Sequence, residues 1–335
     1  MLKSGLPNIS LGAFVVLASL FSSALFAQPK NENPDFGSDL TSNNYYQLGD
    51  ETYVYENPGT FDFIKFFPGN VIKYSKDTFR QENLFNIGAM VSVTALLVAY
   101  DQQMLDETQR FGRRIGLTGN NRMNRAFYVF GLPIELPHDK DTALYFIGDG
   151  WTHTSVAGMF LGYGLINKNS RALQTASQIA CGMITTGLTT QLLKHITGRE
   201  SPFKATAPGG KWRPFPDQIK YHKNVPAYDA FPSGHLATAM MTFTVINENY
   251  PHSKIVKPVG YTLLTILSFE MVNNGVHWVS DYPLALAMGY SLGKIAVARG
   301  RKSVDSATSD RKHSTRHTTI FPYLQRDGIG LAVAF

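Results

Sequence analysis

Residues 171–197 read RALQTASQIACGMITTGLTTQLLKHIT, an apolar stretch of Ala, Leu, Ile, Met, Gly and Thr without the strict alternation of a half-buried strand. The stretch is too long for a typical strand, so it predicts a helix. The chain then enters a basic segment at 198–232 that is rich in Pro and Gly. Because long loops inside a compact domain are usually functional, this segment is the first place to look for chemistry.

Five further stretches have the same apolar texture and also predict helices: 86–100, 142–166, 235–248, 256–274 and 282–298. Together with 171–197 they predict an all-α fold, a six-helix bundle. The predicted domain boundaries are 1–27 for a signal peptide, 28–80 for an irregular N-terminal lead-in, 81–298 for the helical domain, and 299–335 for a basic linker and a short C-terminal hairpin. The hairpin is predicted because AspGly lies between two β-prone runs near the C-terminus.

Composition sets the outer limits. The chain has 335 residues, of which 44% are hydrophobic, which is enough for a sizeable buried core. The single cysteine, Cys181, excludes a disulfide within the chain, and its apolar neighbours predict a core residue.

The formal net charge of +6 is concentrated in a basic strip at 294–316. Such a strip can contact anionic lipid headgroups or can be a solvated linker, and the sequence leaves both open. Aromatic residues do not alternate with these charges and the sequence carries no nucleic-acid-binding motif, so nucleic acid is not an expected partner.

The first 27 residues have the order of an export signal: Lys3, an apolar run, and small residues ending at Ala27. A retained membrane anchor is the alternative, but the run is shorter than the ~20 residues that span a bilayer. The protein is therefore expected to be exported from a bacterial cytoplasm.

Most of the apolar stretches are short for a hydrocarbon layer of ~30 Å, or contain polar residues such as His153 and Gln191. The mean hydropathy is slightly negative, at −0.12. A shallow membrane-embedded bundle facing the periplasm and a soluble periplasmic bundle both remain open, with a preference for the membrane.

Three segments bracket the basic loop: LysHisIleThrGlyArgGluSerPro at 194–202, ProSerGlyHis at 232–235, and AsnAsnGlyValHisTrpValSerAsp at 273–281. Ser233 and Gly234 at a helix start can present N–H groups to an anion, and Lys194 adds a positive charge. Two histidines permit one to attack phosphorus while the other protonates the leaving oxygen.

His277 and Asp281 are four residues apart, so on a helical turn they share a face. The carboxylate can then fix the tautomer of the imidazole and stabilise its positive charge. Lone histidines on apolar helices, such as His153 and His195, are interpreted instead as core residues.

These segments resemble the three signature motifs of the type 2 phosphatidic acid phosphatase and vanadium haloperoxidase superfamily: Lys-x6-Arg-Pro, Pro-Ser-Gly-His and Ser-Arg-x5-His-x3-Asp. The resemblance covers roughly residues 86–298. It implies that Lys194, Ser233 and Gly234 bind phosphate, and that His235 is the general acid. It also implies that His277, oriented by Asp281, is the nucleophile, with no metal and no cofactor.

Both motif arginines are replaced. Ser201 stands where the first motif has Arg, and Glu270 and Met271 stand where the third has Ser-Arg. Arginines make strong charge-assisted bonds to phosphoryl groups. Cations of the loop could substitute for them, namely Arg199, Lys204 or Arg213, and Arg199 is favoured because it lies two residues from Ser201.

The expected function is metal-independent hydrolysis of a phosphomonoester or a lipid (di)phosphate through a phosphohistidine. Its partners would be a phosphorylated lipid or small phosphomonoester substrate and membrane lipid. The alternative is a catalytically degenerate phosphatase fold that binds an anionic headgroup or partner. Vanadate-dependent halide oxidation is disfavoured, because the missing arginines argue against tight vanadate binding.

The N-terminal segment yields the first testable prediction. If residues 1–27 are a signal peptide, the mature protein begins near Gln28 after removal of the apolar run. Intact mass and N-terminal sequencing of the exported protein measure this directly. A mature chain that retains Met1 would contradict the prediction.

Overall fold

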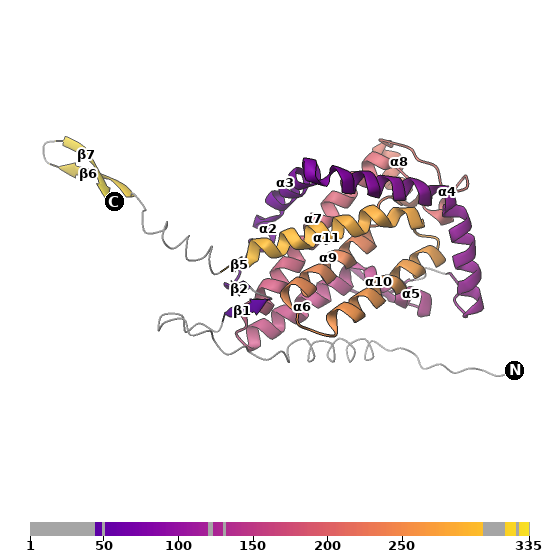
Figure 1. Ribbon diagram of the computed structural model, residues 1–335, viewed down its shortest axis with the longest axis horizontal. Coiled ribbons are helices and arrows are strands. Elements are labelled where there is room, and N and C mark those ends of the chain that lie inside the picture. Colours follow the sequence, from indigo (N-terminus) through magenta and orange to yellow (C-terminus); the bar gives the residue numbers. More distant parts are fainter. Residues whose placement is uncertain are drawn as a thin grey trace.

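The computed structural model in Figure 1 describes residues 44–48, 51–119, 123–129, 132–303, 319–325 and 328–334. The predicted signal peptide and much of the predicted basic linker lie outside these residues.

Helices make up most of the described chain. In chain order the elements are β1 Tyr45–Leu48, β2 Glu51–Val54, α2 Asp62–Lys65, α3 Phe67–Thr78, η1 Gln81–Asn83, α4 Leu84–Arg114, β3 Met123–Val129, β4 Leu132–Pro137, α5 Lys140–Tyr145, η2 Phe146–Gly148, α6 Gly150–Ile166, α7 Ser170–Thr197, η3 Pro202–Lys204, α8 Gln218–Lys223, η4 Val225–Ala227, α9 Gly234–Asn249, α10 Val256–Asn273, η5 Val279–Asp281, α11 Tyr282–Gly300, β5 Lys302–Ser303, β6 Thr319–Gln325 and β7 Gly328–Ala334.

Helix α9 lies at the centre of the bundle, where it contacts α6, α7, α10 and α11. Its side chains Leu236, Met241 and Val245 are fully buried. Helix α11 approaches α9 closely because Gly289 faces it: a Cβ there would lie 2.3 Å from the Ala237 carbonyl oxygen. The close contact at Gly289 holds the first turn of α9, which follows Ser233, against α11.

The predicted mostly helical fold is confirmed, but the count of six helices is not. All six apolar stretches are helical, and α4 extends well beyond the predicted 86–100. The stretch 142–166 is divided because Asp149 caps a new helix, its carboxylate accepting a hydrogen bond of 2.8 Å from the Trp151 N–H. Helices α2, α3 and α8 are additional.

The segment expected to be an irregular lead-in is ordered over much of its length. Strands β1 and β2 pair with each other, and β2 also pairs with β5 from the far end of the domain. Helix α3 is amphipathic but short and polar on average, and the residue that it buries is Asn70, whose Nδ2 donates to Cys181 Sγ at 3.3 Å. Cys181 is buried, as expected.

Two further hairpins complete the described chain. Strands β3 and β4, which the sequence did not predict, pair between α4 and α5. At the C-terminus β6 and β7 pair antiparallel with Gln325 opposite Gly328, so the predicted hairpin is present.

Helix α4 presents an apolar surface to the outside of the bundle. Phe85, Val91 and Leu96 are exposed by 84%, 55% and 61%. Among the described residues, Gln81–Arg114 is the one helical segment long and apolar enough to cross a membrane, with a mean hydropathy of 1.6 over an 18-residue window within it. Figure 1 shows α4 running along the edge of the bundle beside α11. The finding is consistent with membrane association.

Two helix ends position the candidate site. Helix α7 ends at Gly198 in the left-handed conformation, with φ of 56°, and the Gly198 N–H donates to the Lys194 carbonyl. Helix α9 begins after Ser233, whose hydroxyl accepts from the Leu236 N–H at 3.4 Å. The long loop 198–232 thus starts and ends at fixed points.

Gly198 supports a prediction about stability. A Cβ at this position would lie 2.0 Å from the Arg213 carbonyl oxygen, and the left-handed conformation disfavours any L side chain. We expect Gly198→Ala to lower the free energy of unfolding by about 2 kcal/mol or more. Gly187→Ala is the control, because a Cβ on this exposed position of α7 meets nothing within 4 Å. Thermal and denaturant unfolding of both variants provide the measurement. If Gly198→Ala is as stable as Gly187→Ala, the left-handed, closely packed conformation of Gly198 is refuted.

Candidate active site

The structure brings the three bracketing segments together at one end of the bundle. A Cβ on Gly234 would lie 3.9 Å from Lys194 Nζ, so the start of α9 faces the end of α7. The rings of His235 and His277 have centroids 6.3 Å apart. The Ser233 N–H donates to the Asp281 carbonyl at 3.2 Å, which joins the second segment to the third.

His277 is buried and its orientation is fixed from one side. Its Nδ1 lies 2.8 Å from the Ala230 carbonyl oxygen and 3.3 Å from Asp281 Oδ2. Both neighbours are acceptors, so Nδ1 carries the proton and Nε2 keeps its lone pair. An imidazole held this way is arranged for attack through Nε2.

His235 contacts a residue that the sequence analysis did not identify. The Tyr145 hydroxyl, from the end of α5, lies 2.9 Å from His235 Nε2, and the two rings pack with centroids 4.7 Å apart. Burial lowers the pKa of His235 to about 3, and the nearby His277, Lys194 and His153 act in the same direction. His235 is therefore neutral at physiological pH.

Lys194 is buried near the end of α7, and its Nζ lies 3.3 Å from Asp229 Oδ2. One turn earlier, the buried Thr190 hydroxyl has no hydrogen-bond partner among the described residues. A phosphate that binds to Lys194 would compete with the Asp229 carboxylate. Asp229 and Thr190 had no motif signal and are recognised from the tertiary structure alone.

Arg199 has a different place from the one predicted. Its guanidinium is fully buried, and Nη1 donates to Asp281 Oδ1 and to Ser280 Oγ, both 2.6 Å away. Its Nη2 donates to Asp101 Oδ2 at 2.5 Å and to the Gly209 carbonyl at 2.8 Å. Both terminal nitrogens are engaged by protein acceptors, and Nε has no hydrogen-bond partner among the described residues, so this geometry does not favour the predicted phosphate contact of Arg199.

The other loop cations do not replace the missing arginines either. Arg213 pairs with Glu200 and lies over the Tyr228 ring, while Lys204 is exposed beside Phe203. Within the described residues, no hydrogen bond, ion pair or ring contact joins Arg213 or Lys204 to His235 or His277.

The three residues that depart from the motifs, Met271, Glu270 and Ser201, have different environments. Met271 faces the site, with Sδ 3.5 Å from Ser233 Oγ, so a thioether occupies the place of the motif arginine. Glu270 accepts from Asn273 Nδ2 at 3.3 Å, and burial raises its pKa to about 7. Ser201 is buried, and its N–H donates to the Pro226 carbonyl.

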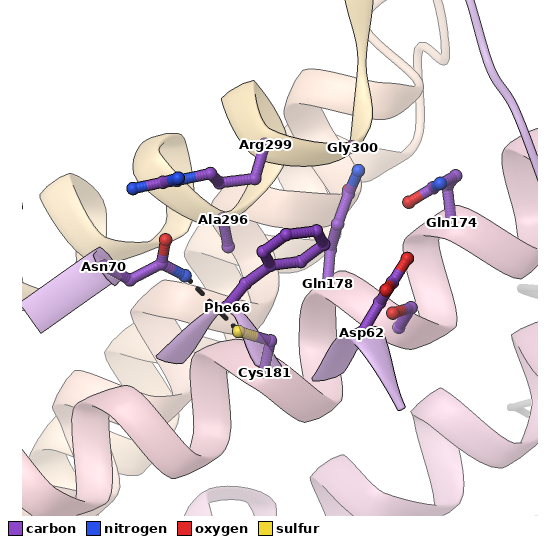
Figure 2. A pocket seen from close by; sticks show the side chains of 10 residues that line it. Asp62, Phe66, Asn70, Gln174, Gln178, Cys181, Ala296, Arg299 and Gly300 are labelled. Atoms are coloured by element: carbon purple, nitrogen blue, oxygen red, sulfur yellow. Dashed lines mark hydrogen bonds between the residues drawn. The ribbon is translucent and has the colours of Figure 1, made fainter. Parts of the chain in front are cut away.

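A separate pocket lies between α3, α7 and α11 (Figure 2). Asn70, Gln178, Cys181 and Arg299 are among the residues that line it, and its volume of about 10 Å³ holds roughly one water molecule. Cys181, which lines this pocket, and Lys194, at the candidate site, are about 20 Å apart along the axis of α7. The pocket is therefore remote from the two histidines and too small for a substrate.

No group of three or more His, Cys, Asp or Glu side chains in the described part of the chain is arranged to hold a metal ion.

Part of the chain, including this end of the bundle, is similar to a known family. Residues 175–304 match the model of the PAP2 superfamily. The chain also aligns with the crystal structure of the first transmembrane PAP2 type phosphatidylglycerolphosphate phosphatase from Bacillus subtilis. That alignment has 17% identity, covers 76% of this chain and 98% of the other, and has a TM-score of 0.34. No curated protein matches the chain.

The lowered pKa of His235 gives a prediction that can be measured without turnover. Its imidazole should stay neutral from pH 8 to about pH 4 in the free protein, because burial disfavours its charge. Added inorganic phosphate should raise the pKa, because an anion stabilises the imidazolium. NMR titration of the C2–H signal reports both effects, with the exposed His252 as an internal reference. Titration near the ordinary value of about 6.5, unaffected by phosphate, would contradict this description.

The same shift predicts acid sensitivity. The unfolded chain binds the proton at its ordinary pKa of about 6.5, while the folded chain binds it only near pH 3. The free energy of unfolding should therefore fall as the pH is lowered from about 6.5 toward 3, because protonation of His235 favours the unfolded chain.

Proposed function

We propose, from the membership of residues 175–304 in the PAP2 superfamily, that this chain is a metal-independent phosphatase acting through a phosphohistidine on His277. The observation that carries the proposal is the geometry of His277, whose Nδ1 is occupied by Ala230 and Asp281 so that Nε2 is the nucleophilic atom. Its substrate is a phosphomonoester or a lipid (di)phosphate.

In the first step Nε2 of His277 forms a bond to phosphorus while the bond from phosphorus to the leaving oxygen breaks. His235 gives its proton to that oxygen. The neutral His235 of the free protein gains this proton when the anionic substrate binds, because the phosphate charge favours the imidazolium. Water then hydrolyses the phosphohistidine, with His235 as the base.

Charge on the phosphoryl oxygens is balanced by few groups. Lys194 is the nearby cation, and the N–H groups at the start of α9, after Ser233 and Gly234, add the positive end of a helix. The Asp229 carboxylate already balances part of the Lys194 charge and would repel a phosphate bound beside it. We therefore expect slower turnover than two additional arginines would permit.

A lipid substrate at a membrane surface is favoured by α4. Its apolar stretch ends at Tyr100, and the next residue, Asp101, is buried against Arg199 beside the histidines. If the exposed apolar face of α4 lies in lipid, the site is at the boundary of the bilayer. We propose that the protein is exported and attached to a bacterial membrane with this site facing the periplasm.

The alternative function, binding an anionic headgroup without turnover, is favoured by one observation. Met271 fills the position of a motif arginine with an apolar side chain in contact with Ser233. A protein of this kind would bind phosphate but would form no phosphoenzyme.

The test is phosphate release from soluble and lipid phosphates by the purified protein in the presence of a chelator. His277→Ala should abolish any trapped phosphoenzyme. His235→Ala should slow hydrolysis of alkyl phosphates by about 10²-fold but affect p-nitrophenyl phosphate less, because nitrophenolate leaves without a proton.

His252→Ala is the control, because this exposed histidine lies outside the site. Parent-like turnover in both site variants would overturn the mechanism. Phosphate binding without release by the parent protein would favour the degenerate alternative.

A further inference from the structure

Asp101 is buried on the inner face of α4, outside the segment that matches the PAP2 superfamily. We propose that Asp101 is a positioning residue for the nucleophile, acting through Arg199 and Asp281 on His277. The inference rests on the proposed function, in which His277 attacks phosphorus. Asp101 itself is held by two contacts with Ser280: the Ser280 N–H donates to Oδ1 at 3.1 Å, and the hydroxyl donates to Oδ2.

The contacts form a continuous chain of charged groups. Asp101 accepts from Nη2 of Arg199, and Asp281 accepts from Nη1 of the same guanidinium. The other oxygen of Asp281 accepts from the Trp278 N–H at 2.8 Å and lies 3.3 Å from His277 Nδ1. The position of the Asp281 carboxylate therefore depends on Arg199, and that of Arg199 depends on Asp101.

Charge explains why a second carboxylate is needed. A phosphorylated or protonated imidazole is positive, and the carboxylate beside it has to balance that charge. Here Arg199 binds Asp281 directly, so these two residues alone sum to zero. Asp101 brings the buried cluster back to a net charge of −1.

The surroundings of His277 make this balance necessary. Lys194 faces the site from α7 and would repel a positive His277, while His235 on α9 is neutral once it has given up its proton and cannot balance the charge. The Asp229 carboxylate is paired with Lys194. Within the described residues, the net negative charge that contacts His277 comes from the cluster of Asp101, Arg199 and Asp281.

Four variants separate a positioning role from a purely structural one. Asp101→Asn keeps the shape but leaves a net charge of zero. Arg199→Gln leaves two buried carboxylates. The double variant Asp101→Asn with Arg199→Gln leaves Asp281 alone, with a net charge of −1 again. Glu107→Gln removes an exposed carboxylate from the same helix and is the control.

The first readout is independent of turnover. Imidazole ¹⁵N shifts distinguish a protonated from an unprotonated ring nitrogen, so they report the tautomer of His277. Because the Ala230 carbonyl still accepts from Nδ1 in every variant, the Nδ1–H form should stay the major one. We expect a larger share of the Nε2–H form in Asp101→Asn than in the parent and in Glu107→Gln, and a return toward the parent ratio in the double variant.

The second readout is phosphoenzyme formation from p-nitrophenyl phosphate. Asp101→Asn should slow it by about 10-fold or more, and the double variant should be faster than Asp101→Asn. The affinity for inorganic phosphate, which forms no bond to His277, should change little, because neither Asp101 nor Arg199 contacts the phosphate in the proposed complex. A structural role predicts instead that the double variant is at least as impaired as the worse single variant.

Thermal unfolding shows which variants fold. If Asp101→Asn does not fold, the double variant decides: the parent tautomer ratio supports the inference and a larger share of the Nε2–H form overturns it. A parent-like tautomer ratio and parent-like rate in folded Asp101→Asn also overturn it. A parent protein that forms no phosphoenzyme would refute the proposed function, while the ¹⁵N shifts still test the role of Asp101.

Discussion

The buried guanidinium of Arg199 is the interaction on which the geometry of the site depends. It binds Asp101 from α4, Asp281 from η5 and the Gly209 carbonyl from the long loop, between the faces of Trp212 and Trp278. Burial of a charge costs several kcal/mol unless it is paired and hydrogen-bonded. Three segments far apart in the sequence must therefore meet at one point, and the two carboxylates that satisfy Arg199 are fixed with it.

This use of Arg199 changes the electrostatics of phosphate chemistry at the site. A chain that has replaced two motif arginines by Ser201 and Met271 also commits its nearest loop arginine to a structural ion pair. What faces a phosphate is Lys194, already paired with Asp229, and the amino end of α9. The proposed activity thus relies on the histidines and on backbone dipoles more than on side-chain cations.

The two faces of helix α4 differ in polarity and in what they contact. Its outer face is exposed and apolar, which fits contact with lipid, while its inner face carries Asp101 into the buried cluster. The helix lies outside the segment that matches the family model, yet it supplies a charge to the site. A shift of α4 would move Asp101 and its partner Arg199, and would thereby displace the Asp281 carboxylate.

The sequence by itself determined the mostly helical fold and the grouping of Lys194, Ser233, His235 and His277, because apolar texture and motif spacing are local properties. Tertiary structure decided the rest. Arg199 could be assigned to phosphate only while its buried carboxylate partners, more than 80 residues away in sequence, were unknown. Tyr145 and Asp101 carry no local signal, because their roles come from contacts across the bundle. Helix α3 was missed because it is too polar on average to stand out as an apolar segment, and the residue that it buries is Asn70, which donates to Cys181.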